Sequence, residues 1–321
     1  MIRFVMTRGH ERTHTKVVKD PAAPRIELLH YDGLFASRQL PRAAYVFTDL
    51  DRLAPWDLEL AAAVHRDLAA AGLPVLNDPA RARTRFALLR ALHEAGLNDF
   101  NAYRLDEGVR PTRYPVFLRR AAGHGRPLSK LLADWSEAQG AIDRALARGI
   151  PESGLLLIEY AAEPVAPGLF RKLALSRIGS LWVPQICVHD ERWLVKYGKA
   201  ACATPELYEE EFQIVSGNPF AEPVQRAFEI AGIEYGRADF GLVGGRVQIY
   251  EINTNPTLKP GTNHPVARRA ESLRLVWKNH MAAFRELDPG PLPGDPVALR
   301  SPRLLRHQGL LGRLIRSRET P

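Results

Sequence analysis

The pattern of apolar and polar positions predicts alternating strands and helices at the start of the chain. Residues 42–48 form a short apolar run typical of a strand, and apolar positions recur at helical spacing over 55–71. A second short strand, 73–76, is followed by Asn, Asp and Pro, which begin turns and cap helices, and a further helix is expected over 80–95. We therefore expect an α/β domain in this part.

The middle of the chain has longer extended runs. An extended stretch over 115–120 leads through a small loop to a helix over 129–148, and a strand follows over 154–161. Two β-like runs are expected within 170–186, and residues 193–196 indicate one more strand. We expect this part to be largely antiparallel sheet.

Helical spacing returns in the last third of the chain. Helices are expected over 205–214, 223–231 and about 265–287, and the Pro/Gly-rich stretch 289–294 breaks the pattern before an arginine-rich tail. Between the second and third helices, two strands joined through a Gly-Gly pair predict a hairpin over 235–253.

Three polar residues occupy unusual positions in this hairpin. Glu251 and Asn253 are two apart and so project from one face of their strand, where a packed sheet would place apolar side chains. A tight two-residue turn at Gly244-Gly245 would put Asp239 on the other face, whereas a loop of odd length would set it opposite Glu251. If the three residues cooperate, the loop is therefore odd. Two carboxylates and an amide oxygen on one face are hard ligands that suit Mg²⁺.

The composition excludes several classes of protein. The 321 residues are 45% hydrophobic and 25% charged, which is typical of a globular chain and not of disordered or collagen-like ones. Two cysteines, Cys187 and Cys202, are too few for a disulfide framework or a cysteine-rich zinc site. No run of about 18 apolar residues occurs, and the N-terminus becomes polar before a signal-peptide core forms, so we expect a cytoplasmic protein.

The net charge of +8 is concentrated near the end of the chain. Over residues 300–321, six arginines stand against one glutamate, and this difference of five accounts for most of the excess. The charge is therefore no strong signal of nucleic-acid binding. Leucines among these arginines leave two interpretations: an amphipathic helix in weak contact with an anionic surface, or a solvated or domain-docked tail.

The hairpin resembles a known motif. Gly-Arg-Ala-Asp at 236–239 and Tyr-Glu-Ile-Asn-Thr-Asn-Pro at 250–256 resemble the metal-binding hairpin of the ATP-grasp superfamily, as in glutathione synthetase, D-alanine:D-alanine ligase and the ribosomal-protein glutamate ligases. The 12-residue spacing from Asp239 to Glu251 and the pattern Glu-x-Asn-x-x-Pro carry the match, which extends more weakly over 76–287.

The resemblance implies a mixed α/β (α+β) chain with the ATP-grasp fold. Two α+β subdomains would enclose ATP, preceded by a small α/β domain. The expected units are an N-terminal domain (1–95), a central ATP-grasp subdomain (96–165), a C-terminal ATP-grasp subdomain with the metal-binding hairpin (166–288), and a Pro/Gly linker with the basic tail (289–321).

The same resemblance implies roles for the hairpin residues. Asp239, Glu251 and Asn253 would hold one or two Mg²⁺ ions, or Mn²⁺ in their place, that bridge the ATP phosphates, with Glu251 shared. Arg237 and Asn255 would stabilise the transferring phosphoryl group or an acyl-phosphate.

Three further cations are implied at the phosphates. Arg119 ends the extended stretch where the family usually has a phosphate-binding lysine, and its planar fork differs from a lysine point charge. Lys172 and Lys196 either reach phosphates or a substrate carboxylate, or are ordinary solvated strand lysines.

The base and ribose of ATP have candidate partners next in the chain. Glu159, Tyr160 and Ala161 resemble the hinge whose backbone reads the adenine edge, and Glu163 is the candidate for the ribose hydroxyls.

Two other patterns remain open. Gly123-His124-Gly125 is either a loop that closes over phosphates or a plain turn. Cys187 and His189 alternate on a strand, but two ligands do not make a metal site, and packing in a core is the simpler interpretation.

The implied activity is an ATP- and Mg²⁺-dependent ligase that joins a carboxylate to an amine, or to a thiol, through an acyl-phosphate. Its substrates besides ATP would be small molecules or peptides that carry these groups. The alternatives are a phosphotransferase of the same fold acting on a small hydroxyl substrate, and a non-catalytic module that binds nucleotides or anionic surfaces.

Overall fold

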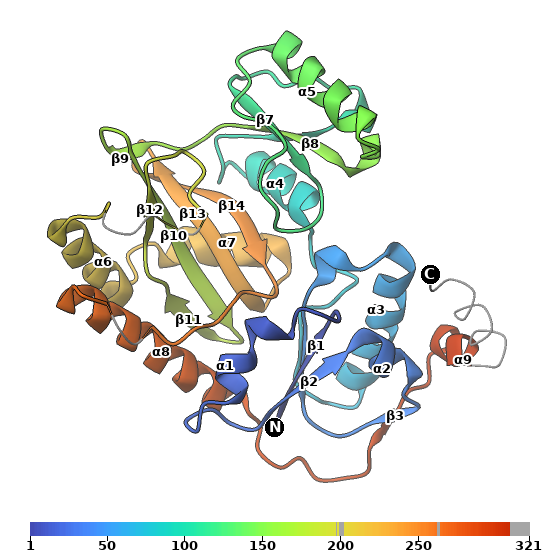
Figure 1. Ribbon diagram of the computed structural model, residues 1–321. Helices are drawn as coiled ribbons and strands as arrows, with labels where there is room; N and C mark the ends of the chain where they lie inside the picture. The colour runs from blue at the N-terminus through green and yellow to red at the C-terminus, as the bar shows by residue number, and fades with distance from the viewer. Residues whose placement is uncertain (197, 199–201, 262–263, 309–321) are drawn as a thin grey trace.

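The expected α/β alternation is present and begins earlier in the chain than the sequence pattern indicated. The computed structural model describes residues 1–196, 198, 202–261 and 264–308. Four parallel strands in the order β2-β1-β4-β5 form the first sheet, drawn in blue and light blue in Figure 1. They are β1 (Ile2–Met6), β2 (Ile26–His30), β4 (Ala44–Phe47) and β5 (Val75–Leu76). The sequence missed β1 and β2 because Arg3 and Glu27 interrupt these short apolar runs.

The strand order places polar residues at the edge of this sheet. Strands β2 and β4 lie on opposite sides of β1. Where the strand order reverses in this way, a crevice opens at the carboxyl ends of the strands. Thr7 follows β1 and Asp49 follows β4, and the Thr7 N–H and hydroxyl donate to Asp49 Oδ2 at 3.1 and 2.9 Å. A short 3-10 turn, Leu50–Arg52, then carries Asp51 beyond the sheet.

The end of the described chain returns to this N-terminal unit. Strand β15 (Val297–Ala298) pairs with β3 (Gln39–Leu40), and α9 (Pro302–Gln308) packs against two helices of the unit with Leu304 fully buried (Figure 1). The helices of the unit are α1 (Thr15–Val18), α2 (Tyr31–Ala36) and α3 (Pro55–Ala70), with a 3-10 turn at Glu11–Thr13. Residues 297–308 are therefore docked on the N-terminal unit. The remaining tail, 309–321, lies outside the described residues.

The central unit is a three-stranded antiparallel sheet between two helices. Its elements are β6 (Ala102–Arg104), β7 (Val116–Arg120), β8 (Leu155–Glu159), α4 (Arg85–Glu94) and α5 (Trp135–Ala147), with 3-10 turns at Leu105–Glu107 and Glu152–Gly154. Side chains alternate along β8, so that Leu155 and Leu157 pack in the core under α5, and Leu156 and Ile158 pack with Leu89 of α4.

The C-terminal unit is a larger antiparallel sheet with helices packed against it. The strands run in the order β11-β10-β13-β14, and β9 and β12 pair with β10 (Figure 1). The strands are β9 (Pro164–Ala166), β10 (Leu169–Ile178), β11 (Leu181–Pro184), β12 (Val188–Asp190), β13 (Tyr235–Val243) and β14 (Arg246–Asn253); the helices are α6 (Pro205–Gly217), α7 (Ala221–Ala231) and α8 (Ala267–Leu287).

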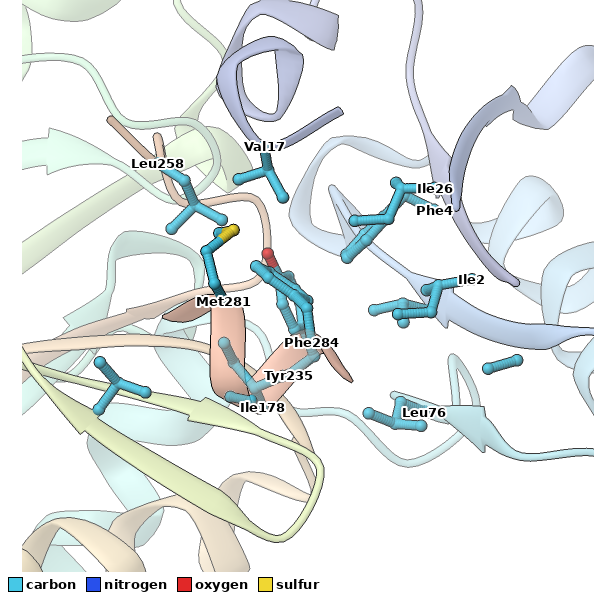
Figure 2. Packing of buried hydrophobic residues seen from close by; sticks show 14 of the residues in the cluster. Ile2, Phe4, Val17, Ile26, Leu76, Ile178, Tyr235, Leu258, Met281 and Phe284 are labelled. Carbon is cyan, nitrogen blue, oxygen red and sulfur yellow. The ribbon is translucent and has the colours of Figure 1, made fainter. Parts of the chain in front are cut away.

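A shared core joins the N-terminal and C-terminal units. Figure 2 shows Phe4 of β1, Tyr235 of β13 and Phe284 of α8 facing one another, and all three are at most 1% exposed. His14 is also fully buried here, with its Nε2 hydrogen-bonded to the Tyr235 hydroxyl. His280 of α8 stacks on Phe284. This core holds the hairpin strand β13 against the N-terminal sheet.

Three expectations about local structure were wrong. Helix α4 begins at Arg85 instead of residue 80, because Asp78 accepts turn hydrogen bonds from Arg81 and Ala82. Helix α5 begins at Trp135 instead of residue 129, because the Asp134 side chain caps it. Residues 193–196 form bends and no strand.

Cys187 and Cys202 both lie in the described part of the chain, and neither is in a disulfide. Within the same residues, no helix combines the length and apolar character that crossing a bilayer requires.

Candidate nucleotide and metal site

The turn of the β13-β14 hairpin is the tight two-residue type. Gly244 and Gly245 both have positive φ, and they connect Val243 directly to its partner Arg246. The expectation of a loop of odd length is therefore wrong.

A β-bulge corrects the register further along the hairpin. Phe240 pairs with Ile249, as the tight turn dictates, but the next pair is Asp239 with Glu251. Tyr250 is the extra residue, and a single inserted residue moves every later side chain of the strand to the other face. The two carboxylates thus face each other as the sequence analysis expected, through a bulge instead of an odd loop.

Asp239 is held by two cations. Its side chain is 5% exposed and accepts hydrogen bonds at 2.8 Å from Lys172 Nζ on β10 and from Arg237 Nε. Burial alone would raise the pKa of Asp239, but Arg237 and Lys172 lower it below its ordinary value. The carboxylate is therefore ionised at neutral pH.

Glu251 faces three cations from the central unit. Arg85 Nη2 donates to Glu251 Oε2 at 2.6 Å, while His124 Nδ1 and Arg119 Nη2 lie 3.6 and 3.8 Å from the same oxygen. Burial would raise the pKa of Glu251, but His124, Arg85 and Arg119 together hold it well below its usual range. Burial and the neighbouring Arg85 charge lower the pKa of Arg119 to about 10, so that it remains cationic.

Arg85 also fixes the end of β7. It is the first residue of α4, its side chain is 4% exposed, and its Nη1 donates to the Ala121 carbonyl at 3.0 Å. Arg85 therefore connects the start of α4, the end of β7 and the Glu251 carboxylate.

His124 joins all three units of the fold. Its Nε2 lies 3.5 Å from Asp51 Oδ2 of the N-terminal unit, and its Nδ1 faces Glu251 of the C-terminal unit. The Gly123 N–H donates to Asp51 Oδ2 at 3.2 Å. Burial would lower the pKa of His124, but Asp51 and Glu251 raise it to about 9. The 123–125 segment is thus a loop packed over the carboxylates, and its imidazole is charged at neutral pH.

A cavity connects this charged cluster to an apolar region. Trp193 lies between Phe117 and Tyr160, with ring centroids 5.1 and 5.8 Å apart, respectively. The apolar part of the lining includes Phe100, Phe117, Ile158, Tyr160, Phe170, Trp193 and Tyr250; the charged part includes Arg119, His124, Glu159, Arg171, Lys172, Lys196, Asp239 and Glu251. An apolar pocket with a few convergent polar groups is the usual form of a small-molecule site.

The expected hinge lines the cavity, but the carboxylate of Glu159 is bonded to the neighbouring strand. Glu159, Tyr160 and Ala161 are all part of the lining. The Glu159 carboxylate accepts hydrogen bonds from the Asn101 N–H at 3.0 Å and the Tyr103 hydroxyl at 2.9 Å, so it supports the neighbouring strand.

Glu163, the candidate for the ribose, is at the hairpin turn. Its side chain is exposed and accepts a hydrogen bond from the Gly244 N–H at 2.7 Å. Glu163 is not among the residues that line the cavity.

Asn253 is the last residue of β14, and Asn255, two residues later, contacts the N-terminal unit. Asn253 Oδ1 accepts a hydrogen bond from the Asn255 N–H at 2.8 Å. Asn255 Nδ2 donates to Asp49 at 2.9 Å, and Asn255 Oδ1 accepts from the Thr13 hydroxyl at 2.6 Å. Asn255 therefore connects the end of β14 to the N-terminal unit and does not line the cavity.

Lys196 reaches the cavity from an irregular segment. Its Nζ donates to the His124 carbonyl at 2.8 Å, so it lies against the loop that covers Glu251.

The residues present fit a divalent ion that is shared with phosphates. Within the described chain, no three His, Cys, Asp or Glu side chains converge on one point. Asp239, Glu251 and the Asn253 amide would offer hard oxygen ligands, which suits Mg²⁺ because it takes one or two carboxylates and completes its shell with water and phosphate oxygens. The pair Cys187 and His189 is buried, and burial raises the pKa of the Cys187 thiol to about 11, which agrees with packing in a core.

Three contributors to the site were not identified from the sequence. Arg85 and Asp51 lie far from the hairpin in the chain, and Tyr250 is part of the motif without a chemical signature of its own. Only Asp51 had a usable signal, because it closely follows the strand over 42–48, and residues after parallel strands gather at one edge of a sheet.

Comparison with known proteins adds evidence on the fold. No protein-family model and no curated protein sequence matches the chain. Among solved structures, D-alanine–D-alanine ligase from Bacillus anthracis complexed with ATP is similar at 13% identity and a TM-score of 0.50, over 89% of this chain and 97% of that one. VanG D-Ala:D-Ser ligase from Enterococcus faecalis has 11% identity and a TM-score of 0.49, over 88% and 98% of the two chains. The RimK domain ATP-grasp protein from Sphaerobacter thermophilus has 15% identity and a TM-score of 0.48, over 90% and 99%. The first of these similarities bears on the fold alone, and the chain has the ATP-grasp fold, as expected from the hairpin.

Proposed function

We propose that this ATP-grasp protein is an ATP- and Mg²⁺-dependent ligase that joins a carboxylate to an amine through an acyl-phosphate. The observation that carries the proposal is the pairing of Asp239 with Glu251 by a bulge, beside an apolar cavity and inside a group of cations. The similar Bacillus anthracis structure is a ligase complexed with ATP, which supports the use of ATP.

ATP would lie with its base among the aromatic side chains and its phosphates at the charged part. The backbone of Tyr160 and Ala161 would face the base, as at the hinge of related proteins. Lys172 and Lys196 and the guanidinium of Arg119 would contact the phosphates. The central unit and the C-terminal unit would thus enclose the nucleotide.

Asp239, Glu251 and Asn253 would hold Mg²⁺ against these phosphates. When bound, the ion would neutralise charge that develops on the transferring phosphoryl group. Asn255 would be a positioning residue in this arrangement, because its side chain fixes the end of β14 to Asp49 and Thr13.

In the first step, a substrate carboxylate attacks the γ-phosphorus of ATP. An oxygen–phosphorus bond forms, the bond to the β-phosphate oxygen breaks, and ADP leaves. Arg237 and Lys172, both at 2.8 Å from Asp239, would disperse the negative charge on the phosphoryl oxygens. The product of this step is an acyl-phosphate.

In the second step, the amine attacks the acyl carbon. A carbon–nitrogen bond forms, the carbon–oxygen bond to phosphate breaks, and the nitrogen loses a proton to the departing phosphate or to water. The loop at His124 contacts both Asp51 and Glu251 and would exclude water from the acyl-phosphate.

The charge of the cleft also favours a second candidate, a phosphotransferase that acts on a hydroxyl of an anionic substrate. Beside two carboxylates, the cavity and its immediate surroundings bring together Arg85, Arg119, His124, Lys172, Lys196 and Arg237. Such an excess suits a substrate with its own phosphates. Hydroxylamine separates the two activities, because it traps an acyl-phosphate as a hydroxamate and a kinase forms no such intermediate.

The first experiment is calorimetric titration of ATP into the protein with and without Mg²⁺, repeated on Asp239→Asn/Glu251→Gln. Binding that Mg²⁺ strengthens in the wild type but not in the double variant supports the proposal and justifies a screen of carboxylates and amines for ADP release. A folded wild-type protein that binds no nucleotide contradicts it.

A further inference from the structure

Tyr250 is the one residue that the bulge adds to the hairpin. Without it, the register set by Gly244 and Gly245 would turn Glu251 away from Asp239. Bulges near active sites commonly re-aim a side chain, and this bulge brings Glu251 to the face that Tyr250 shares with Asp239 and Gly241. Glu251 faces the other carboxylate, and Tyr250 faces the central unit.

The contacts of Tyr250 belong to the central unit although the residue is on β14. Its hydroxyl donates to the Ala161 carbonyl at 2.9 Å, at the segment expected to face the base. Its ring lies 6.3 Å from the ring of Phe100 and packs on the cluster that contains Leu89 and Ile158. The side chain also lines the cavity, so it spans from the metal hairpin to the base segment.

The neighbouring strand leaves room for this orientation. A Cβ added to Gly241 would lie 2.9 Å from Cζ of the Tyr250 ring and closer still to its hydroxyl. Gly241 is in an extended strand without positive φ, and the three atoms nearest to such a Cβ all belong to Tyr250, so the tyrosine accounts for a small residue there. The ring crosses β13 at a place where any larger residue would displace it.

We propose that Tyr250 is a positioning residue that fixes the base-binding segment at Ala161 relative to the metal-binding carboxylates. Tyr250 then contributes to both parts of the site. Its insertion brings the next residue, Glu251, opposite Asp239, and its hydroxyl binds the hinge at Ala161. The inference rests on the proposed use of the cavity for ATP. It implies that the hydroxyl contributes to affinity for the base and not to affinity for the phosphates.

The test compares two ligands on the full chain by calorimetry in the presence of Mg²⁺: ATP, and tripolyphosphate, which lacks the base. Tyr250→Phe keeps the bulge and the ring and removes only the hydroxyl. Tyr45→Phe is the matched control, because the Tyr45 hydroxyl donates to a backbone carbonyl, that of Pro41, at 2.7 Å in the N-terminal unit. Thermal melting checks that all variants fold.

We expect Tyr250→Phe to weaken ATP binding about fivefold to tenfold, the effect of one hydrogen bond, with tripolyphosphate affinity unchanged. Tyr45→Phe should change neither affinity. An ATP affinity within twofold of wild type, or equal losses for both ligands, overturns the role of Tyr250 while leaving the proposed function standing. A wild-type protein that binds neither ligand overturns both.

Gly241→Ala provides a second, independent variant. The added methyl displaces the tyrosine, so ATP affinity should fall while tripolyphosphate affinity stays. The loss should be smaller when Gly241→Ala is introduced into Tyr250→Phe, because the closest clash is with the hydroxyl. Full additivity of the two changes contradicts the proposal.

Discussion

The charged part and the apolar part of the cleft are stabilised by different interactions. The charged part consists of buried or half-buried ions from all three units, and each carboxylate is held by cations at hydrogen-bond distance. The apolar part consists of aromatic rings of the central unit, Phe100, Phe117 and Tyr160, that contact Tyr250 and Trp193 of the C-terminal unit. Truncating one ion leaves its partner unpaired in a buried place, whereas truncating one ring leaves only a space. Substitutions should therefore be far less tolerated in the charged part than in the apolar part.

The most severe test of this difference is Glu251→Gln. We expect turnover to fall by about a thousandfold, because the variant removes the negative charge of the proposed metal ligand, which would act in the transition state. It should also lower the free energy of unfolding by on the order of 3 kcal/mol, because Arg85 loses its buried partner. Asn253→Ala is the comparison, with a similar loss of turnover and a smaller loss of stability. Wild-type turnover in either variant would exclude the metal assignment.

Lowering the pH should destabilise the core that contains His14 and His280 before it affects the carboxylates of the site. Burial lowers the pKa of His14 to about 3 and that of His280 to about 4. Between the ordinary value of 6.5 and these values, the unfolded chain binds protons that the folded chain does not, so stability falls as pH falls. The expected slope is up to about 1.4 kcal/mol per pH unit for each histidine.

Denaturant unfolding from pH 7 to 4.5 measures this slope. His280→Gln should flatten it. The lowered pKa values of Asp239 and Glu251 add their own loss only at lower pH, as these carboxylates become protonated. A stability that is constant between pH 6.5 and 4.5 would show that the histidines are not buried in their neutral form.

The phosphate end can be separated from the base end with tripolyphosphate. Lys172→Met should weaken its binding about tenfold, and the loss should shrink as salt is raised, because the interaction is between charges. Lys130→Met is the matched control, since Lys130 is exposed and 3.9 Å from Glu137 outside the charged cluster. Equal losses in the two variants would contradict a specific phosphate role for Lys172.

The smallest expected effect belongs to the base end. Trp193→Ala should weaken ATP binding about fivefold through the loss of apolar contact, with tripolyphosphate affinity unchanged and little dependence on salt. Trp56→Ala removes a tryptophan that is 65% exposed on α3 and should have no effect. A tripolyphosphate loss in Trp193→Ala would mean that the two parts of the cleft are not separable.

The sequence predicted the hairpin well because its information is local. Asp239, Glu251 and Asn253 lie within 15 residues of one another, and the alternation of a strand determines which of them share a face. Even there, the sequence left the register open, since a tight turn and an odd loop predict opposite faces for Asp239. The structure resolved it with a bulge at Tyr250, which depends on packing against the central unit.

The partners of the hairpin were beyond sequence analysis for a physical reason. Arg85 is 166 residues from Glu251 in the chain, and Asp51 is 73 residues from His124. Their positions follow from how separate units pack, which no local spacing encodes. The same applies to Asn255, whose place in the motif implied chemistry but whose side chain bonds to Asp49 and Thr13.

The sequence by itself therefore indicated the ATP-grasp fold, through the resemblance of a short motif to that family, and the polar residues of the hairpin, through strand periodicity. Only the tertiary structure decided which cations hold those carboxylates, which residue joins the base segment to the hairpin, and where residues 297–308 dock. These features arise from contacts between distant segments, and their free energy depends on burial that exists only once the units have packed together.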